Sequence, residues 1–126
     1  MRLRLDPDSP LPLYAQLDRA IRAAIAAGTL RAGDQLPTVR QMAVDLRINA
    51  NTVARVYAEL ERAGVLATQR GVGTFVRDPG AIARPARDRE RQLRSLADRF
   101  LADAAAIGLS LPEVIRHLQA RSQETR

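Results

Sequence analysis

The sequence predicts a mainly α-helical protein with one small β hairpin. Apolar residues recur at helical spacing along most of the chain. Residues 38–62 read as two short helices separated by a tight turn, and a glycine-flanked tip follows in residues 70–76. The order helix, turn, helix, hairpin is the layout of a winged helix-turn-helix domain. We assign this domain to residues 1–77, a linker to residues 78–86, and a two-helix C-terminal segment to residues 87–126.

The N-terminal part is expected to hold a short strand and one long helix. Residues 2–5 alternate Arg-Leu-Arg-Leu, which indicates an edge strand, and three prolines follow within residues 7–12. From Leu13 the apolar spacing predicts a helix of about 14 residues. It should end near Gly28, because glycine readily adopts the left-handed conformation of a helix C-cap. Gly33-Asp34 then signals a turn.

The next two helices carry clear start signals. Thr38 is followed three residues later by Gln41, the pattern of a capping box, and the helix that it opens should span about eight residues. Arg47 and Ile48 form the turn, and Asn49 is a suitable N-cap for the following helix. Gly64 should end that helix. Its inward face is predicted to be Val53, Val56, Tyr57 and Leu60.

A hairpin and two further helices complete the prediction. Val65–Gln69 and Thr74–Arg77 are the strands, joined at Gly71-Val72-Gly73. A helix over residues 87–107 is broken by Gly108, and Ser110 with Glu113 forms a second capping box. The apolar residues of the two tail helices are Leu93, Leu96, Ala97, Phe100, Leu101, Ala104, Ile107, Leu111, Val114, Ile115 and Leu118.

That apolar seam is interpreted as a dimerisation surface. Five of its members in the first tail helix step by four and three residues, as in a coiled coil. Two such helices cannot bury both faces or enclose a sizeable pocket by themselves. We therefore expect a second copy of the chain to cover the seam. The alternative is that the two helices dock on their own N-terminal domain.

Composition excludes several classes of chemistry. The net charge is +6, the sequence pI is about 11.3, and all 20 basic residues are Arg, which suits a polyanionic partner such as nucleic acid. Without Cys or Lys there is no disulfide, thiolate nucleophile or Schiff-base lysine. The single His117 makes a metal site improbable, and no catalytic constellation or cofactor motif is present, so an enzyme is not expected. The N-terminus has no long apolar run, and we expect a cytoplasmic protein.

The third predicted helix presents a polar surface opposite its apolar stripe. Recognition helices read DNA with their N-terminal residues, and Asn suits adenine as Arg suits guanine. Asn51 and Arg55 are therefore candidate base readers, and Thr52 a candidate for base or phosphate. Asn49 is explained by capping alone, so a DNA contact there is an open alternative. The competing interpretation is a solvated face with helix pairs such as Arg55–Glu59.

Other candidates lie outside the third helix. Arg40 occupies the first turn of its helix, where a cation is mildly unfavourable unless a phosphate binds there. Arg47, in the turn, is a weaker phosphate candidate. Arg70 leads into the hairpin tip and is expected to enter the minor groove or bind the DNA backbone. Gly71 and Gly73 would let the protein backbone approach the DNA closely, and the alternative is that they only permit the turn.

These motifs resemble the GntR family of bacterial transcription regulators, most closely its small YtrA-like subgroup. The resemblance rests on Pro12-Leu13-Tyr14-Ala15-Gln16-Leu17, on Leu36-Pro37-Thr38-Val39-Arg40, on Asn49-Ala50-Asn51-Thr52-Val53 and on Arg70-Gly71-Val72-Gly73-Thr74-Phe75-Val76. It implies a homodimeric repressor that binds an inverted-repeat operator of its own operon through Arg40, the start of the third helix and the glycine at the wing. Thr38, two residues before Arg40, is a further candidate for DNA contact.

The resemblance is incomplete in two places. Ala50 and Ala54 stand where better-known branches of the family carry arginines, so base preferences from those branches do not transfer, and Arg55 is expected to assume part of their role. The tail resembles the subgroup in size and helical pattern. Neither effector nor operator sequence can be named. Phe100 and His117 are interpreted as packing residues, and the alternative is that they line a small cavity at a dimer interface. The alternative function is a non-sequence-specific architectural or protein-interaction module.

Overall fold

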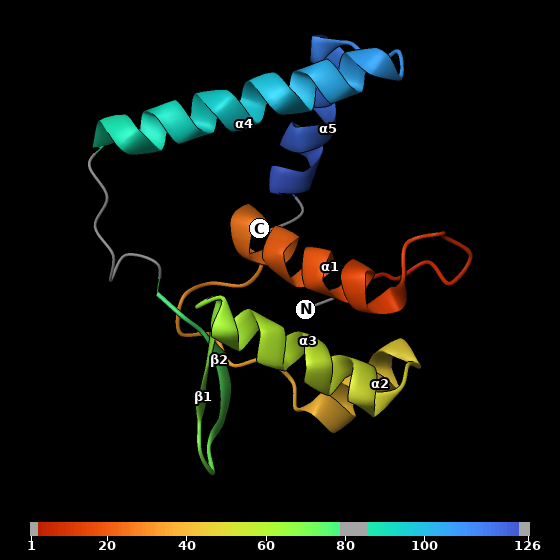
Figure 1. The fold of residues 1–126 in the computed structure, drawn as a ribbon, viewed down its shortest axis with the longest axis vertical. Helices are drawn as coiled ribbons and strands as arrows, with labels where there is room; N and C mark the ends of the chain where they lie inside the picture. Colours follow the sequence, from red (N-terminus) through yellow and green to blue (C-terminus); the bar gives the residue numbers. More distant parts are fainter. Residues whose placement is uncertain (1–2, 79–85, 124–126) are drawn as a thin grey trace. The chain divides into compact units, whose positions relative to one another are not determined.

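The computed structural model describes residues 3–78 and 86–123, which belong to two compact units divided near residue 79. The first unit contains α1 (Leu13–Ala27), α2 (Val39–Leu46), α3 (Ala50–Arg62) and the strands β1 (Leu66–Gln69) and β2 (Gly73–Val76). The second contains α4 (Ala86–Ala106) and α5 (Leu111–Gln123) (Figure 1). The expected helices and hairpin are confirmed. Residues 79–85 of the expected linker lie outside the described residues.

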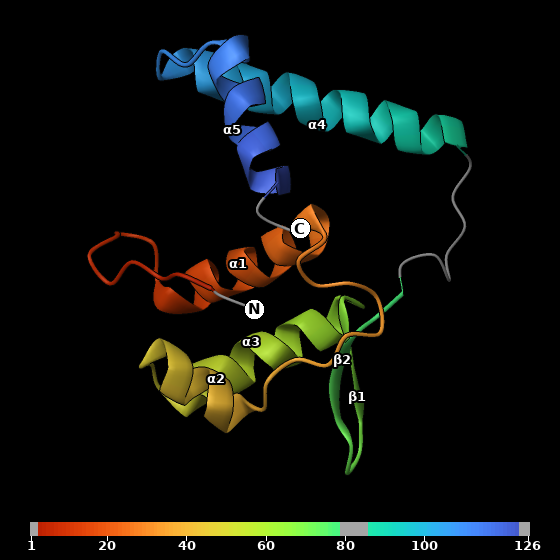
Figure 2. The ribbon, with the colours of Figure 1, turned by 180° about the vertical axis from the view of Figure 1, so that it is seen from behind.

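The three helices of the first unit enclose its core. Helix α1 and helix α2 both pack against α3, and the hairpin extends from the C-terminal end of α3 (Figures 1 and 2). The predicted inward face of α3 is confirmed: Val53, Val56 and Leu60 are fully buried and Tyr57 is 6% exposed. Helix α1 contributes Leu17 and Ile21, and α2 contributes Met42 and Ala43. The core therefore fixes which sides of α2 and α3 remain available to a ligand.

The helix ends follow the capping signals. The Thr38 hydroxyl accepts a hydrogen bond from the Gln41 backbone N–H at 3.1 Å, and the Gln41 side chain accepts one from the Thr38 N–H at 3.0 Å. The Asn49 side chain accepts from the Asn51 N–H at 2.7 Å. Gly28 and Gly64, at φ of 84° and 79°, take the left-handed conformation expected of residues that end a helix.

The hairpin is antiparallel, with Leu66 opposite Val76 and Gln69 opposite Gly73. A third segment joins it, since the Leu36 N–H donates to the Thr74 carbonyl and the Val76 N–H to the Asp34 carbonyl, both at 2.8 Å. The predicted edge strand at residues 2–5 was wrong for its described part, because residues 3–5 form no strand. A four-residue alternation cannot form a strand without a pairing partner, and the segment before α2 takes that place beside β2. Leu3 and Leu5 pack against the core instead.

The second unit is a helical pair with very little internal core. Glu113 closes the predicted capping box, accepting from the Ser110 backbone N–H at 2.7 Å, and Gly108 has a φ of 83°. Within this unit's described residues only Ala104 and Val114 are buried. Leu101 is half-buried, and the other predicted seam residues are exposed, with Leu93 at 62% and Leu96 at 64%. In the described part of the chain, no helix is long and apolar enough to span a bilayer.

Candidate nucleic-acid interface

The N-terminus of α2 is one part of the candidate interface. Arg40 is exposed in the first turn of the helix, where free backbone N–H groups and the positive end of the helix dipole favour an anion. An open polar hollow lies beside this turn, lined by Gln35, Leu36, Pro37, Thr38, Gln41 and Asp45. The oxygen of Thr38 accepts the capping bond, which leaves its hydroxyl hydrogen free to donate. This end of α2 is therefore suited to a phosphate.

A buried tyrosine holds that helix end in place. The Tyr57 hydroxyl, on α3, donates a 2.7 Å hydrogen bond to the backbone carbonyl of Pro37, just before α2 begins. Burial raises the pKa of Tyr57 to about 12, so the hydroxyl keeps its proton far above neutral pH. The sequence predicted Tyr57 only as an apolar core residue. Its bond fixes the start of α2 relative to α3.

The turn between α2 and α3 is made by Arg47 in an unusual conformation. Its φ is 56°, and among the described residues no other non-glycine residue has a positive φ. Its backbone N–H bonds to the carbonyls of Ala43 and Val44, which closes α2. A left-handed conformation costs an L-residue about 1–2 kcal/mol. The arginine side chain is exposed in this strained turn, so the position retains a cation where a glycine would fit more easily.

The start of α3 carries the predicted base readers, but they are not equally free. Asn51 is exposed and Thr52 half-buried. The acceptor of Asn49 is used in capping, although its amide hydrogens remain available. Arg55 is engaged: its guanidinium carbon lies 4.0 Å from the centroid of the Tyr14 ring, and its Nε is 3.2 Å from Glu59 Oε1. The sequence predicts the Arg55–Glu59 pair as the alternative to a base contact by Arg55. It does not predict the contact with Tyr14.

No spacing rule could have revealed the contact between Tyr14 and Arg55. The sequence places Tyr14 at the start of the helix predicted from Leu13, and its ring packs against the core. The two side chains lie in different helices and meet only because α1 packs against α3. An aromatic side chain at the start of α1 was the only available signal, and it did not specify a partner.

The wing supplies the remaining candidates. Arg70 and Gly71 are exposed at its tip, and Gly71 has a φ of 79°. Gly73 has a structural explanation, because its φ of 148° is one that other residues rarely adopt. A Cβ atom there would also displace the end of the Gln35 side chain, whose amide donates to the Val72 carbonyl at 3.1 Å. Gln35 was not singled out from the sequence. It connects the strand-like segment before α2 to the hairpin tip.

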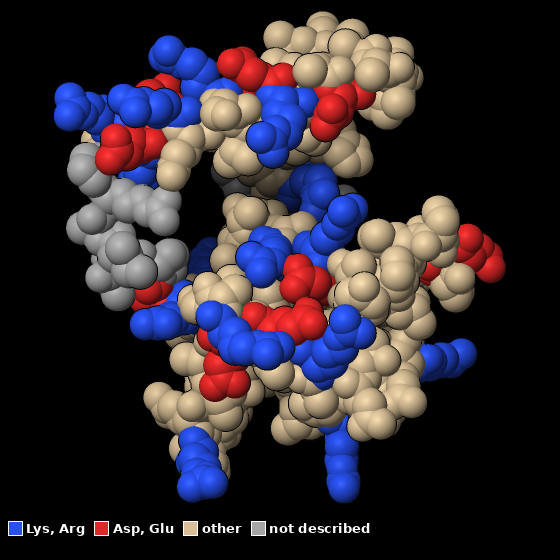
Figure 3. Space-filling view, in the orientation of Figure 1, with Lys and Arg blue, Asp and Glu red and all other residues tan. Residues whose placement is uncertain are grey.

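The first unit therefore brings the candidates together on three neighbouring structures: α2, the start of α3, and the hairpin. Figure 3 shows arginine side chains projecting at the lower edge of the molecule beneath α2 and at the end of the hairpin, with largely uncharged surface between them. Basic groups flanking a less charged surface suit DNA, because backbone contacts position a protein while base contacts confer sequence preference.

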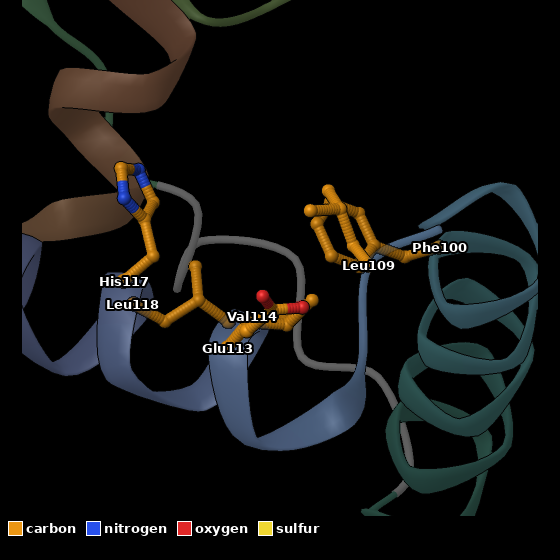
Figure 4. Close-up of a pocket in the computed structure, with 6 residues that line it drawn as sticks. All are labelled: Phe100, Leu109, Glu113, Val114, His117 and Leu118. Atoms are coloured by element: carbon orange, nitrogen blue, oxygen red, sulfur yellow. The ribbon is translucent and has the colours of Figure 1, made fainter. Parts of the chain in front are cut away.

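The second unit contains a small hollow between its two helices. It has a volume of about 360 Å³, the lower end of the range for ligand pockets, and is lined by Phe100, Leu109, Glu113, Val114, His117 and Leu118 (Figure 4). Hydrogen bonds from the Ser110 backbone and then its hydroxyl lower the pKa of Glu113. In the described part of the chain, no cluster of three or more His, Cys, Asp or Glu side chains is placed to hold a metal ion.

Comparison with known proteins supports the regulatory interpretation. Residues 13–76 match the profile of the "Bacterial regulatory proteins, gntR family". The HTH-type transcriptional regulator YhcF of Bacillus subtilis is 32% identical over 88% of this chain and 90% of its own length. The HTH-type transcriptional repressor YtrA of the same organism is 39% identical over 59% of this chain and 57% of its own length.

A solved structure adds a relative that is bound to DNA. The DNA-binding domain of AraR in complex with operator ORX1 superposes with a TM-score of 0.52 and 29% identity, over 59% of this chain and 92% of that domain. The winged-helix architecture, the profile match and the near full-length similarity to YhcF agree with one another. The chain belongs to the gntR family of bacterial transcriptional regulators, which are not enzymes.

Proposed function

We propose that this protein is a sequence-specific DNA-binding regulator that acts as a homodimeric repressor on an inverted-repeat operator, in its own operon. The observation that carries the proposal is the arrangement of the first unit: an arginine at the anion-favouring end of α2, an exposed polar start of α3, and an arginine at the tip of the wing. The operator complex of AraR supports DNA as the ligand.

The phosphate contacts are assigned to α2, the turn and the wing. Arg40 and the free N–H groups of α2 would bind one phosphate together, with Thr38 donating its hydroxyl hydrogen. Arg47 would bind a neighbouring phosphate, and Arg70 with Gly71 the backbone or minor groove. Gly73 is assigned a conformational role, because its φ of 148° is one that other residues rarely adopt. These contacts orient α3 but carry little sequence preference.

The base contacts are assigned to the start of α3. Asn51 is exposed and its side chain makes no hydrogen bond or ion pair to another described residue, so it is the leading reader of adenine. Thr52 and the amide of Asn49 would contact bases or backbone nearby. Arg55 would read a guanine only after leaving Tyr14 and Glu59. Arg55 therefore contacts a base only if the interaction with guanine is more favourable than its contacts with Tyr14 and Glu59 together.

The homodimer is supported by where apolar side chains are exposed. Of the ten large apolar residues exposed in the described chain, eight belong to the second unit, including Phe100 at 53% and Ile107 at 75%. A concentration of exposed apolar side chains marks a protein–protein surface. We propose that a second copy covers the seam, and that the 78–86 segment links the DNA-binding unit to it. Two-fold symmetry would then match the two halves of an inverted repeat.

Repression is proposed from the name of one relative, the repressor YtrA. The test is footprinting and gel-shift titration on the region upstream of this protein's own gene, with random DNA of equal length as the comparison. The proposal expects a protected inverted repeat with half-sites about one helical turn apart. Equal affinity for the upstream region and random DNA would indicate an architectural protein instead, and no DNA binding at low salt would indicate a protein partner.

The same titration separates the assigned roles. Arg40→Ala should weaken binding to all sequences alike, whereas Asn51→Ala should also relax preference among sequences. Arg22→Ala is the matched control, because Arg22 is an exposed arginine on α1 that pairs with Asp18 and is not assigned to DNA. If the Arg40 and Asn51 variants bound like this control, the assignment of the interface would be wrong.

A further inference from the structure

The contact between Tyr14 and Arg55 has a consequence for how sharply this protein distinguishes operators. We propose that Tyr14 is a positioning residue that competes with guanine for Arg55, and so lowers sequence discrimination at the base pair that Arg55 reads. This inference rests on the proposed DNA-binding function. It concerns a side chain that does not itself touch DNA.

The geometry shows which partner can move. The Tyr14 ring is half-buried and packs against the core, so its position is fixed by α1. The Arg55 side chain is 56% exposed and rests on the ring and on Glu59. Asn51 lies one helical turn earlier, so a change of rotamer can turn Arg55 toward the surface that Asn51 occupies. Arg55 can therefore adopt two positions, one on the Tyr14 ring and one facing the DNA-binding surface.

The two resting contacts are weaker than a good base contact. An exposed cation–π pair is equivalent to about two- to fivefold in an equilibrium constant. The pair with Glu59 adds about twofold or less, since an exposed pair four residues apart is weak and arginine precedes the acid, the less favourable order. A bidentate arginine–guanine contact is equivalent to about five- to 150-fold. Together the two resting contacts are equivalent to about two- to tenfold, which is below most of that range. A well-formed guanine contact therefore draws Arg55 away from Tyr14, with a smaller net gain in affinity than an unrestrained arginine would give.

The discrimination argument follows from comparing two duplexes. On a duplex with guanine, Arg55 leaves Tyr14, and the lost contact subtracts from the affinity. On a duplex without guanine, Arg55 stays on Tyr14 and loses nothing. Tyr14 therefore weakens binding to the guanine duplex only. A variant that lacks the ring should bind the guanine duplex about two- to fivefold more tightly and the other duplex equally well.

The experiment uses the full chain and a set of operator duplexes in which each base pair of the footprinted site is replaced in turn. The pair read by Arg55 is the one whose replacement no longer matters in Arg55→Ala. At that pair, Tyr14→Leu should raise discrimination two- to fivefold, Tyr14→Phe should retain the parental value because it keeps the ring, and Tyr14→Leu in the Arg55→Ala background should change nothing.

A second variant keeps the test independent of the packing of Tyr14. Glu59→Gln should raise discrimination at the same pair by up to about twofold. Asp18→Asn is its matched control, because it breaks the corresponding ion pair with Arg22 on α1 and changes the net charge equally. If Tyr14→Leu and Glu59→Gln leave discrimination unchanged or lower it, Arg55 is a brace between α1 and α3 and the inference is wrong. Failure of the parent protein to bind any duplex would instead refute the proposed function.

Discussion

The left-handed turn at Arg47 allows the costs of backbone and charge to be measured separately. Arg47→Ala and Arg47→Gly both remove the guanidinium, so they lose any phosphate contact and any favourable interaction with the C-terminal end of α2 equally. They differ in the backbone. At a φ of 56°, alanine bears the steric cost of about 1–2 kcal/mol, whereas glycine bears none. The glycine variant in turn has a free energy of unfolding lower by about 0.4–1 kcal/mol, because glycine gives the unfolded chain more conformational freedom.

The glycine variant should consequently be more stable than the alanine variant by about 0.5–1 kcal/mol. For a domain of this size that difference corresponds to roughly 2–8 °C in melting temperature. Relative to the parent, glycine should be almost neutral, because the backbone gain offsets the loss of a cation at a helix C-terminus, about 0.3–1 kcal/mol. Thermal and urea unfolding followed by circular dichroism would measure both differences.

DNA binding should respond to charge alone. Both variants should bind more weakly than the parent, by the same factor, and the slope of log affinity against log salt should shrink by about 0.9 if Arg47 neutralises one phosphate. Arg47→Lys, which keeps the charge, should restore most of the affinity. Equal stability of the alanine and glycine variants would refute the strained turn, and an unchanged salt slope would refute the phosphate contact.

Three further variants test the fold, the dimer and the interface. Tyr57→Phe should destabilise the fold by about 0.5–1.5 kcal/mol, because the Pro37 carbonyl loses its donor. Since burial raises the pKa of Tyr57 above its ordinary value of 10 to about 12, the parent should lose about 2 kcal/mol as pH rises from 10 through 12, and Tyr57→Phe should lack this loss in pH-dependent unfolding. Leu96→Asp should convert a dimer to monomers in sedimentation, and weaken operator binding more than half-site binding, while Asp103→Asn leaves both unchanged. Arg40→Ala should reduce the salt slope by about 0.9.

Features set within one helical turn were read correctly from the sequence. The capping boxes of α2 and α5 depend on residues three apart, so their hydrogen bonds follow once a helix forms. The buried stripe of α3 follows from helical periodicity in the same way. These local rules were sufficient for every helix and for the hairpin, and they placed the candidate DNA-binding residues on the correct elements.

Tertiary packing decided what local rules could not. The alternation at residues 2–5 favoured a strand, but a strand needs a partner, and the segment at Asp34–Leu36 bonds to β2 instead. The engagement of Arg55 by Tyr14 and the need for glycine at Gly73 beside Gln35 also depend on elements far apart in the chain. The sequence by itself determined which helices form and which faces they bury, because those depend on neighbouring residues. Only the tertiary structure decided which of the exposed side chains are already engaged, because that depends on which helix packs beside them.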